Sequence, residues 1–232
     1  MIQFDIITIF PHFFDSFLNE SIIKRAQKQK LIKVRVFNLR DYADDRHRTV
    51  DDKPYGGGRG MVLKLKPMYK AISSLNKSKK IKTILFSPRG KKFNQGMAFK
   101  YSKLKRIILV CGRYEGIDER VAKYLIDEQL SIGDYVMMGG EVAAMAVMES
   151  VARLVPGVLG HSELLGERIE KTKKGFTEFP QYTRPEIFNP RLRQSFGGQA
   201  KKSVKWRVPG LLLKGNHKKI EDWRRRHLKT IN

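Results

Sequence analysis

The chain has 232 residues, of which 41% are hydrophobic, so it is long enough for one large or two small domains and too apolar to be disordered. Its 47 lysines and arginines against 23 aspartates and glutamates give a net charge of +24, which favours a polyanionic partner, either a nucleic acid or an anionic membrane surface, with a lysine-rich proteome as the alternative explanation. No apolar run reaches transmembrane length, and the single Cys111 excludes an internal disulfide. The five histidines lack metal-ligand spacing. We therefore expect a cytoplasmic protein.

Segment 1–9 is apolar but carries Asp5 and lacks a basic start, so it predicts a buried strand rather than a signal peptide. Further strands are predicted at 32–39, 82–87 and 106–111, with a shorter one near 132–137. Helical periodicity occurs between them, at 12–29, 66–76, 94–103, 117–127 and 140–155. This alternation predicts an α/β domain with a largely parallel sheet.

The pattern changes after Gly160, so we divide the chain into three parts. Residues 1–160 form the α/β domain, and the polar residues 161–175 form a linker. Residues 176–232 are predicted to form a small, basic, helical C-terminal domain. Its last helix spans about 216–228, with Asn216 as a plausible N-cap.

Three turns follow predicted strands: Phe86–Gly90, Gly112–Gly116 and the turn around Gly133. Ligands of parallel sheets bind beyond the carboxyl ends of the strands, so we expect these turns to line a ligand slot. Glu115, which is placed between glycines, either binds a hydroxyl or amine of the ligand or is solvated.

Two other segments are candidates for contact with a polyanion. The glycine-dense segment 55–61 matches neither a P-loop nor a dinucleotide fingerprint, and it is either a loop that approaches a phosphate or base or a plain surface turn. Between the prolines of 179–185, Tyr182 and Arg184 either stack on a base and pair with a phosphate or belong to an ordered loop. Since no catalytic triad, carboxylate pair or metal cluster emerges, spacing alone leaves the reaction open.

Several longer segments are more specific than spacing. The most specific are Leu109-Val-Cys-Gly-Arg-Tyr-Glu-Gly-Ile-Asp-Glu-Arg120 and Ser131-Ile-Gly-Asp-Tyr-Val136, supported by His47-Arg-Thr-Val-Asp-Asp-Lys-Pro-Tyr-Gly-Gly-Gly58, Leu85-Phe-Ser-Pro-Arg-Gly90 and Pro180-Gln-Tyr-Thr-Arg-Pro-Glu186. With these segments the chain closely resembles the bacterial tRNA (guanine-N1)-methyltransferases, SPOUT-class enzymes that methylate guanine 37 beside the anticodon. The resemblance covers most of 1–190 in order, with a weaker tail.

The resemblance implies a deep trefoil knot in the α/β domain, S-adenosylmethionine as the cofactor and tRNA as the substrate. It also implies a homodimer in which the partner's C-terminal domain completes each site, and it allows for a magnesium ion. The residues that it assigns to the cofactor are Leu85, Phe86, Pro88, Gly112, Tyr114, Glu115, Gly116, Ile132, Gly133, Asp134, Tyr135, Val136, Met137, Gly139 and Gly140. Those that we assign to the RNA substrate are Gly57, Gly58, Arg59, Tyr182 and Arg184.

Two catalytic residues follow from the same resemblance. Arg153 matches the arginine that stabilises charge on guanine O6; its position near the end of an apolar helix also suits the alternative role of a helix cap. Glu170 falls where the family has its general base, an aspartate, with Glu167 or Glu163 as substitutes if the alignment gap lies elsewhere. Lys171 and its neighbouring lysines would lower the pKa and the basicity of this carboxylate.

The chain departs from the family in two more places. Arg59 stands where a small residue or proline is usual, and residues 191–207 look like a basic insertion. Both would add phosphate-binding charge. Two alternatives to the enzyme stay open: a non-catalytic RNA-binding protein on the same fold, and a SPOUT methyltransferase with a different RNA target.

Overall fold

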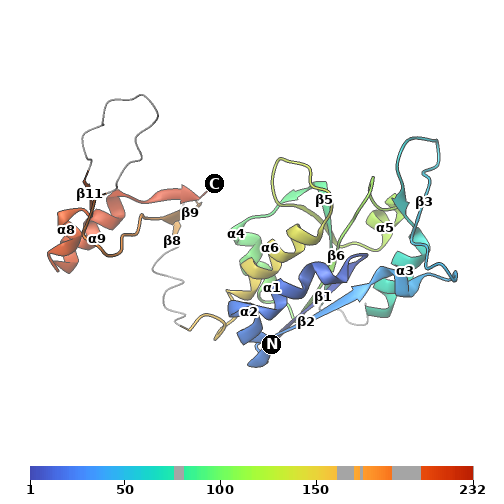
Figure 1. Cartoon of the computed structure of the whole chain (residues 1–232), viewed down its shortest axis with the longest axis horizontal. Helices are drawn as coiled ribbons and strands as arrows, with labels where there is room; N and C mark the ends of the chain where they lie inside the picture. The colour runs from blue at the N-terminus through green and yellow to red at the C-terminus, as the bar shows by residue number, and fades with distance from the viewer. Residues whose placement is uncertain (76–80, 161–169, 173–174, 190–204, 232) are drawn as a thin grey trace. The chain divides into compact units, whose positions relative to one another are not determined.

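The computed structural model describes residues 1–75, 81–160, 170–172, 175–189 and 205–231 (Figure 1). These residues belong to two compact units, Met1–Ser162 and Glu163–Asn232. The predicted linker, 161–175, lies mostly outside the described residues, and the three-part division 1–160, 161–175 and 176–232 stays a prediction.

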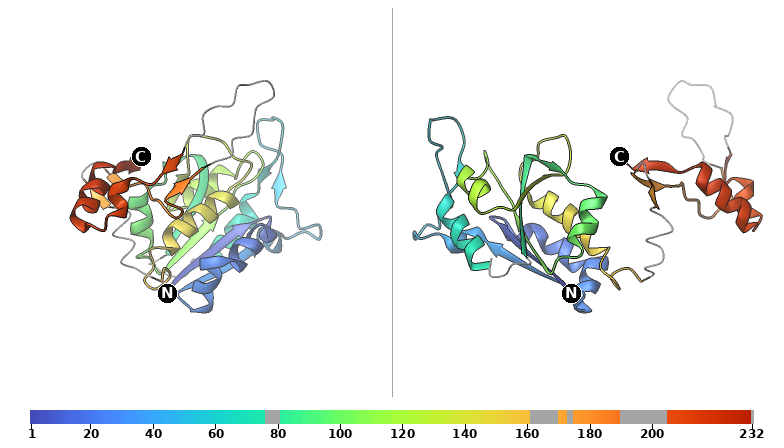
Figure 2. Two further views of the ribbon diagram at one scale, coloured as in Figure 1. Left: turned by 60° about the vertical axis from the view of Figure 1, so that its left-hand side comes forward. Right: turned by 180° about the vertical axis from the view of Figure 1, so that it is seen from behind.

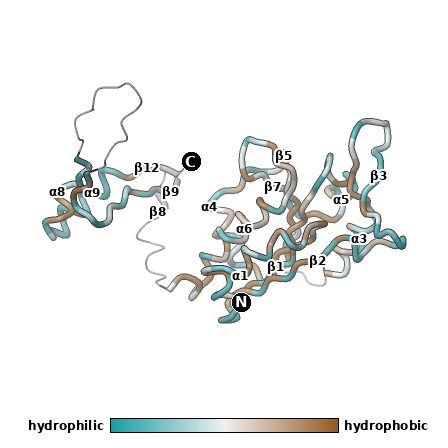
Figure 3. Tube along the Cα trace, viewed as in Figure 1, coloured by the Kyte–Doolittle hydropathy of each residue, from teal (hydrophilic) through white to brown (hydrophobic). Residues whose placement is uncertain are grey.

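The first unit is built on a five-stranded sheet in the order β2-β1-β6-β5-β7, in which every neighbouring pair is parallel. Its strands are β1 (Ile2–Thr8), β2 (Ile32–Asn38), β5 (Ile81–Lys92), β6 (Arg106–Val110) and β7 (Glu128–Ser131). The predicted parallel α/β sheet is therefore confirmed. The apolar strands β1 and β6 are buried inside the sheet, as expected for a sheet that helices cover on both faces. Figure 3 shows hydrophobic residues along β1.

The predicted strand at 132–137 is wrong, because β7 ends at Ser131. The Ser131 hydroxyl donates a hydrogen bond to the Gly133 carbonyl (2.8 Å) and accepts one from the Gly133 N–H (3.3 Å). This local turn takes the chain out of the sheet at the point where the apolar pattern continues. Strand β5, in contrast, runs on past its predicted end, because a register shift between Phe86 and Lys91 restores its pairing with β7.

Helices cover both faces of this sheet (Figure 2). One core cluster contains residues of η1, α2, α4 and α6, and the other contains residues of η2, α3 and α5. The bounds are η1 (Pro11–Phe14), α1 (Asp15–Asn19), α2 (Ser21–Lys28), η2 (Leu39–Tyr42), α3 (Leu65–Leu75), α4 (Gln95–Tyr101), α5 (Glu119–Tyr124) and α6 (Glu141–Ala152). Strands β3 (Asp51–Asp52) and β4 (Val62–Leu63) form a short antiparallel pair that flanks the glycine-dense segment.

Two predicted helices differ from those in the structure. The helix expected at 12–29 is interrupted between α1 and α2, because Glu20 is extended and Ser21 takes a positive φ of 49°. Its first turn, η1, is a 3-10 helix that continues directly into α1. The helix expected at 117–127 is shorter, because the Asp118 side chain accepts a hydrogen bond from the Arg120 N–H and caps α5 just before Glu119.

The second unit is not purely helical, so that prediction is corrected. Its helices, α8 (Gly210–Leu213) and α9 (His217–Arg226), accompany two small antiparallel sheets. One contains β8 (Glu170–Thr172), β9 (Gly175–Glu178) and β12 (Lys229–Ile231), and the other contains β10 (Ile187–Phe188) and β11 (Trp206–Arg207). Strands of two to four residues carry too little alternation to be recognised in a sequence. The predicted cap is present: Asn216 Oδ1 accepts a hydrogen bond from the Lys219 N–H at 3.1 Å.

Among the described residues, no helix is long and apolar enough to cross a membrane.

Candidate functional site

A cavity of about 400 Å³ lies beside the bulge of β5 and the carboxyl ends of β6 and β7. Its walls come from three segments: 85–89 of β5, 112–117 after β6, and 129–140 in and after β7. Pockets of about 300–1,000 Å³ are typical of small-molecule and cofactor sites. The three turns that we expected to share a slot therefore do surround one cavity.

The first wall depends on the irregular part of β5. Leu85 and Phe86 are buried, and the strand then bulges before it pairs again with β7. A Cβ added at Gly90 would lie 2.5 Å from the backbone nitrogen of Leu130, so only glycine allows this close return. Arg89, on the bulge, forms an ion pair with Glu119 of α5 at 2.7 Å.

The second wall is the turn after β6. Tyr114 has a φ of +60° and Gly116 one of +131°, and the Gly116 N–H donates to the Arg113 carbonyl at 3.1 Å. The glycine-dense segment is joined to this turn, because the Glu115 N–H donates to the Met61 carbonyl at 3.0 Å. A Cβ at Gly60 would lie 2.5 Å from Cγ of Glu115. The end of segment 55–61 therefore contacts the rim of the pocket.

The third wall returns across the end of β6. The Gly140 N–H donates to the Gly112 carbonyl at 3.0 Å, and Gly139 forms a β-bridge with Arg113. A Cβ at Gly140 would lie 2.8 Å from Cα of Cys111, which is closer than real Cβ atoms approach backbone. Glycine is therefore required here for the third wall to contact the second.

A buried polar cluster lies beside these two walls. Glu141, at the start of α6, is completely buried; it accepts hydrogen bonds from Arg113 Nε (2.9 Å) and Thr8 Oγ1 (2.7 Å). The Arg113 guanidinium also lies over the ring of Phe10, 4.8 Å from its centroid. Burial first, and then the Glu141 carboxylate, raise the pKa of the Cys111 thiol, so this cysteine is not an activated nucleophile.

All the residues assigned to the cofactor line the pocket except Gly133 and Asp134. Gly133 instead packs against the ring of Tyr135, and the Asp134 carboxylate pairs with Lys92. Arg89, Arg113 and Met138 also line the cavity, although the sequence did not single them out. The signal that points to the first two is an arginine inside a turn that contains glycine.

The predicted catalytic residues lie in different units. Arg153 is the C-cap of α6, where its N–H donates to the Glu149 carbonyl at 3.1 Å. Glu170 is the first residue of β8 in the second unit. The substitutes Glu163 and Glu167 lie outside the described residues. The described residues contain no group of three His, Cys, Asp or Glu side chains that would hold a metal, and magnesium stays a prediction.

The predicted RNA-contacting residues also come from both units. Gly57, Gly58 and Arg59 are exposed in the first. Tyr182, in the second, packs edge-on against Trp223 with the ring centroids 6.1 Å apart, and Arg184 is exposed. Most of the basic insertion, 191–207, lies outside the described residues.

The first unit has a parallel α/β sheet with a glycine-walled pocket at the carboxyl ends of its strands, and the second unit is basic. These features define the class of the protein, which is a two-part α/β protein with a small-molecule site. Residues 2–231 match the family described as tRNA (Guanine-1)-methyltransferase TrmD, and the chain belongs to this family. The family predicted from the sequence is thus confirmed.

Individual relatives agree over almost the whole chain. The chain is 48% identical over 226 residues to the tRNA (guanine-N(1)-)-methyltransferase of Dictyoglomus turgidum, an alignment that covers 97% of this chain and 84% of that protein. For the proteins of the same name from Carboxydothermus hydrogenoformans and Staphylococcus carnosus, the identities are 46% over 224 and 43% over 222 residues. These alignments cover 97% and 96% of this chain, and 81% and 84% of those proteins.

Proposed function

We propose that this protein transfers a methyl group from S-adenosylmethionine to N1 of guanine 37 of tRNA. The observation that carries the proposal is the cavity of about 400 Å³ at the bulge of β5 and the carboxyl ends of β6 and β7, whose walls include segments on which the resemblance to the family rests. tRNA, as the substrate, also accounts for the charge of +24, and it favours the cytoplasm as the location.

The walls of the cavity suit a cofactor that contains a nucleoside. Leu85, Pro88 and Ile132 offer apolar surface for an adenine ring, and backbone groups next to glycines offer hydrogen bonds to its edge. Glu115 adds an acidic side chain at the rim for a ribose hydroxyl or an amine. When bound there, S-adenosylmethionine would supply an electrophilic methyl group on its sulfonium.

The residues of this chain would handle the proton and the charge of guanine. N1 carries a proton at neutral pH, so a base must remove it, and we assign this step to the Glu170 carboxylate. Negative charge then develops on guanine O6, and we assign its stabilisation to hydrogen bonds from the Arg153 guanidinium. Glutamate in place of the family's aspartate has one more methylene group to position.

We also propose that the protein is a homodimer whose partner subunit completes each site. Large apolar side chains are exposed beside the pocket: Val136 is 82% exposed, Met138 88% and Val142 48%. Exposed apolar patches of this kind mark interaction sites, and a second copy would cover this one. The third wall crosses over the end of β6 between Cys111 and Gly140, and we propose that this crossing belongs to a trefoil knot.

The test is methylation of a tRNA transcript by purified protein with S-adenosylmethionine, read by mass spectrometry of the nucleosides. We expect N1-methylguanosine with the wild-type transcript and none with a transcript in which adenine replaces guanine 37. Methylation that survives this replacement would indicate a different RNA target. Salt-sensitive tRNA binding without any methylation would instead favour the RNA-binding alternative.

A further inference from the structure

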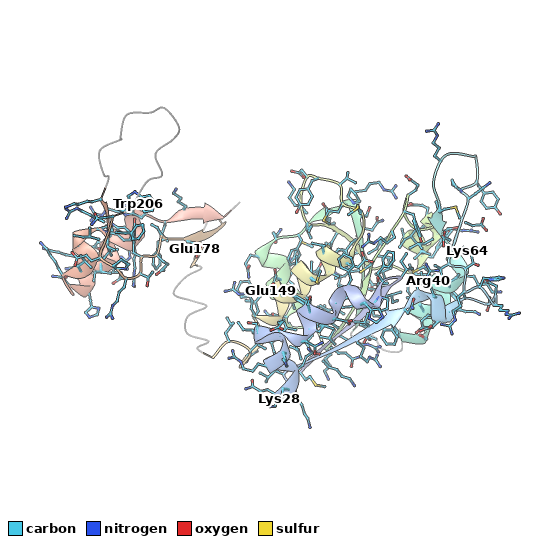
Figure 4. The ribbon with its side chains drawn as sticks, viewed as in Figure 1. Lys28, Arg40, Lys64, Glu149, Glu178 and Trp206 are labelled. Atoms are coloured by element: carbon cyan, nitrogen blue, oxygen red, sulfur yellow. The ribbon has the colours of Figure 1, made fainter. Side chains whose placement is uncertain are left out.

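Two aromatic side chains lie side by side on the small ribbon of the second unit. Phe188 of β10 and Trp206 of β11 are directly opposite each other in the antiparallel register. Their ring centroids are 5.6 Å apart, with the planes inclined by 45°. Because directly opposite residues of an antiparallel pair point to the same side, both rings are on one face of the ribbon. Trp206 is labelled in Figure 4.

This pair remains open to solvent, unlike the other aromatic cluster of the unit. Phe188 is 49% and Trp206 57% exposed. Trp223 of α9, by comparison, is only 8% exposed; it stacks on His227 with a centroid distance of 4.2 Å and receives Tyr182 on its edge. The chain thus uses one of its two tryptophans in the core of this unit and leaves the other on the surface.

The positive charge around Phe188 and Trp206 favours a negatively charged partner. Lys205 and Arg207, on either side of Trp206 in the chain, are exposed. Residues 163–232 contain 18 lysines and arginines and seven aspartates and glutamates, a net charge of +11. A polyanion is attracted to such a surface.

We propose that Phe188 and Trp206 form a stacking platform for an unpaired base of the RNA, made of residues other than those assigned to the methylation pocket. Unpaired bases of RNA loops stack on exposed aromatic rings, while neighbouring cations bind the phosphates. Lys205 and Arg207 would supply those cations. This proposal rests on the proposed function only in taking RNA as the partner. It gives the second unit a recognition site for a single-stranded nucleotide.

The first experiment measures tRNA affinity. Trp206→Ala should weaken binding about tenfold, as expected for the loss of one stacked base, and Trp206→Phe should restore most of it. At saturating tRNA the kcat should be unchanged, because neither Phe188 nor Trp206 is assigned a role in methyl transfer. The slope of affinity against salt should also be unchanged in Trp206→Ala, whereas Arg207→Ala should reduce it, because only the latter loses a phosphate contact.

The second experiment uses the intact wild-type protein, so it does not depend on the folding of a variant. Stacking of a base on Trp206 should quench tryptophan fluorescence and protect it from iodide. A single-stranded oligonucleotide should produce this change and a duplex of the same sequence should not. Trp206→Phe, which keeps only Trp223, should abolish the change.

Two outcomes would overturn the proposed platform. In the first, Trp206→Ala binds tRNA with wild-type affinity and the fluorescence of Trp206 is not quenched in the tRNA complex. In the second, Trp206 is protected from iodide before any RNA is added. The second would mean that protein already covers the pair. A failure of the proposed function looks different, because the platform variants would then change RNA binding in a protein that methylates no tRNA.

Discussion

Arg113 and Glu141 connect two walls of the pocket through one buried ion pair. Arg113 Nε donates to Glu141 Oε2 at 2.9 Å, while the side chains are 14% and 0% exposed. The arginine comes from the turn after β6 and the glutamate from the start of α6, so the pair fixes the second wall against the third. Removing one member of a buried pair leaves the other charge without its partner.

Glu141→Ala should therefore lower the free energy of unfolding by about 3–5 kcal/mol. Glu149→Ala is the matched control, because Glu149 is exposed on the same helix and its replacement by alanine should change stability by less than about 0.5 kcal/mol. Urea unfolding of the two variants measures the difference. Equal stabilities would mean that the ion pair contributes nothing to the fold.

Gly60→Ala should weaken binding of S-adenosylmethionine, because its Cβ would lie 2.5 Å from Cγ of Glu115 and displace that side chain. Gly57→Ala is a close control: both glycines have positive φ, 89° and 80°, but no atom lies within 4 Å of a Cβ at Gly57. Backbone strain is thus shared, and only the contact with Glu115 differs. Isothermal calorimetry with S-adenosylmethionine should detect a loss in the first variant alone, and an equal loss in both would contradict this explanation.

Asp5 should make stability depend on pH in the acid range. Burial by itself would raise the pKa of this carboxyl, but hydrogen bonds from Arg35, Gln3 and Arg106 together hold it below its ordinary value of 3.8. A group whose pKa is lowered by folding stabilises the protein above its unfolded pKa, and this stabilisation is lost as the pH falls below it.

Asp5→Asn should accordingly cost about 3 kcal/mol at neutral pH and progressively less as the pH drops below 3.8. Asp15→Asn serves as the control, since its carboxylate is 66% exposed and bonds only to the exposed ring of His12 among the described contacts. Urea titrations at several pH values test both. A constant difference between wild type and Asp5→Asn across the acid range would exclude the coupling.

Glu170→Gln should abolish methyl transfer, because the amide cannot take the N1 proton, while cofactor and tRNA affinities stay unchanged. Glu170→Asp, which restores the residue type of the family, should remain active. Glu186→Gln controls for the loss of one carboxylate from the same unit, since Glu186 is exposed. Single-turnover kinetics separate the chemical step from binding, and full activity in Glu170→Gln would assign the base to another residue.

Met138→Asp should weaken the proposed dimer, because it places a charge on a side chain that is 88% exposed beside the pocket. Tyr124→Asp is a control on another exposed apolar residue of the same unit, 69% exposed on α5. Sedimentation equilibrium should show dissociation only for the first. If the wild type itself sediments as a monomer, the dimer is refuted.

The sequence predicted the regular part of the first unit well, because long apolar runs such as those of β1 and β6 leave little choice of structure. It failed where a single local interaction overrides periodicity. The hydroxyl of Ser131 ends β7 early, and the positive φ of Ser21 interrupts a helix that the pattern would continue. Neither interaction has a signature that propensity detects.

The candidate site was predicted mainly from motifs. Gly133 and Asp134 belong to a segment that forms the pocket but do not themselves line the cavity; Gly133 instead takes part in the turn at Ser131. The ion pair of Arg113 could not be predicted, because its partner, Glu141, is 28 residues away in the chain and only the fold brings them together. Long-range pairing of this kind is not encoded in local spacing.

The contact of Gly140 with Cys111 has a consequence for inhibitor design. Where two walls of a pocket meet through backbone atoms, no side chain can rotate aside to admit a larger ligand. A competitor must therefore match the existing width between these walls and gain any additional contacts at the open rim, near Glu115 and Met138. A larger side chain at residue 140 would separate these walls, so it would also disturb the site proposed for the cofactor.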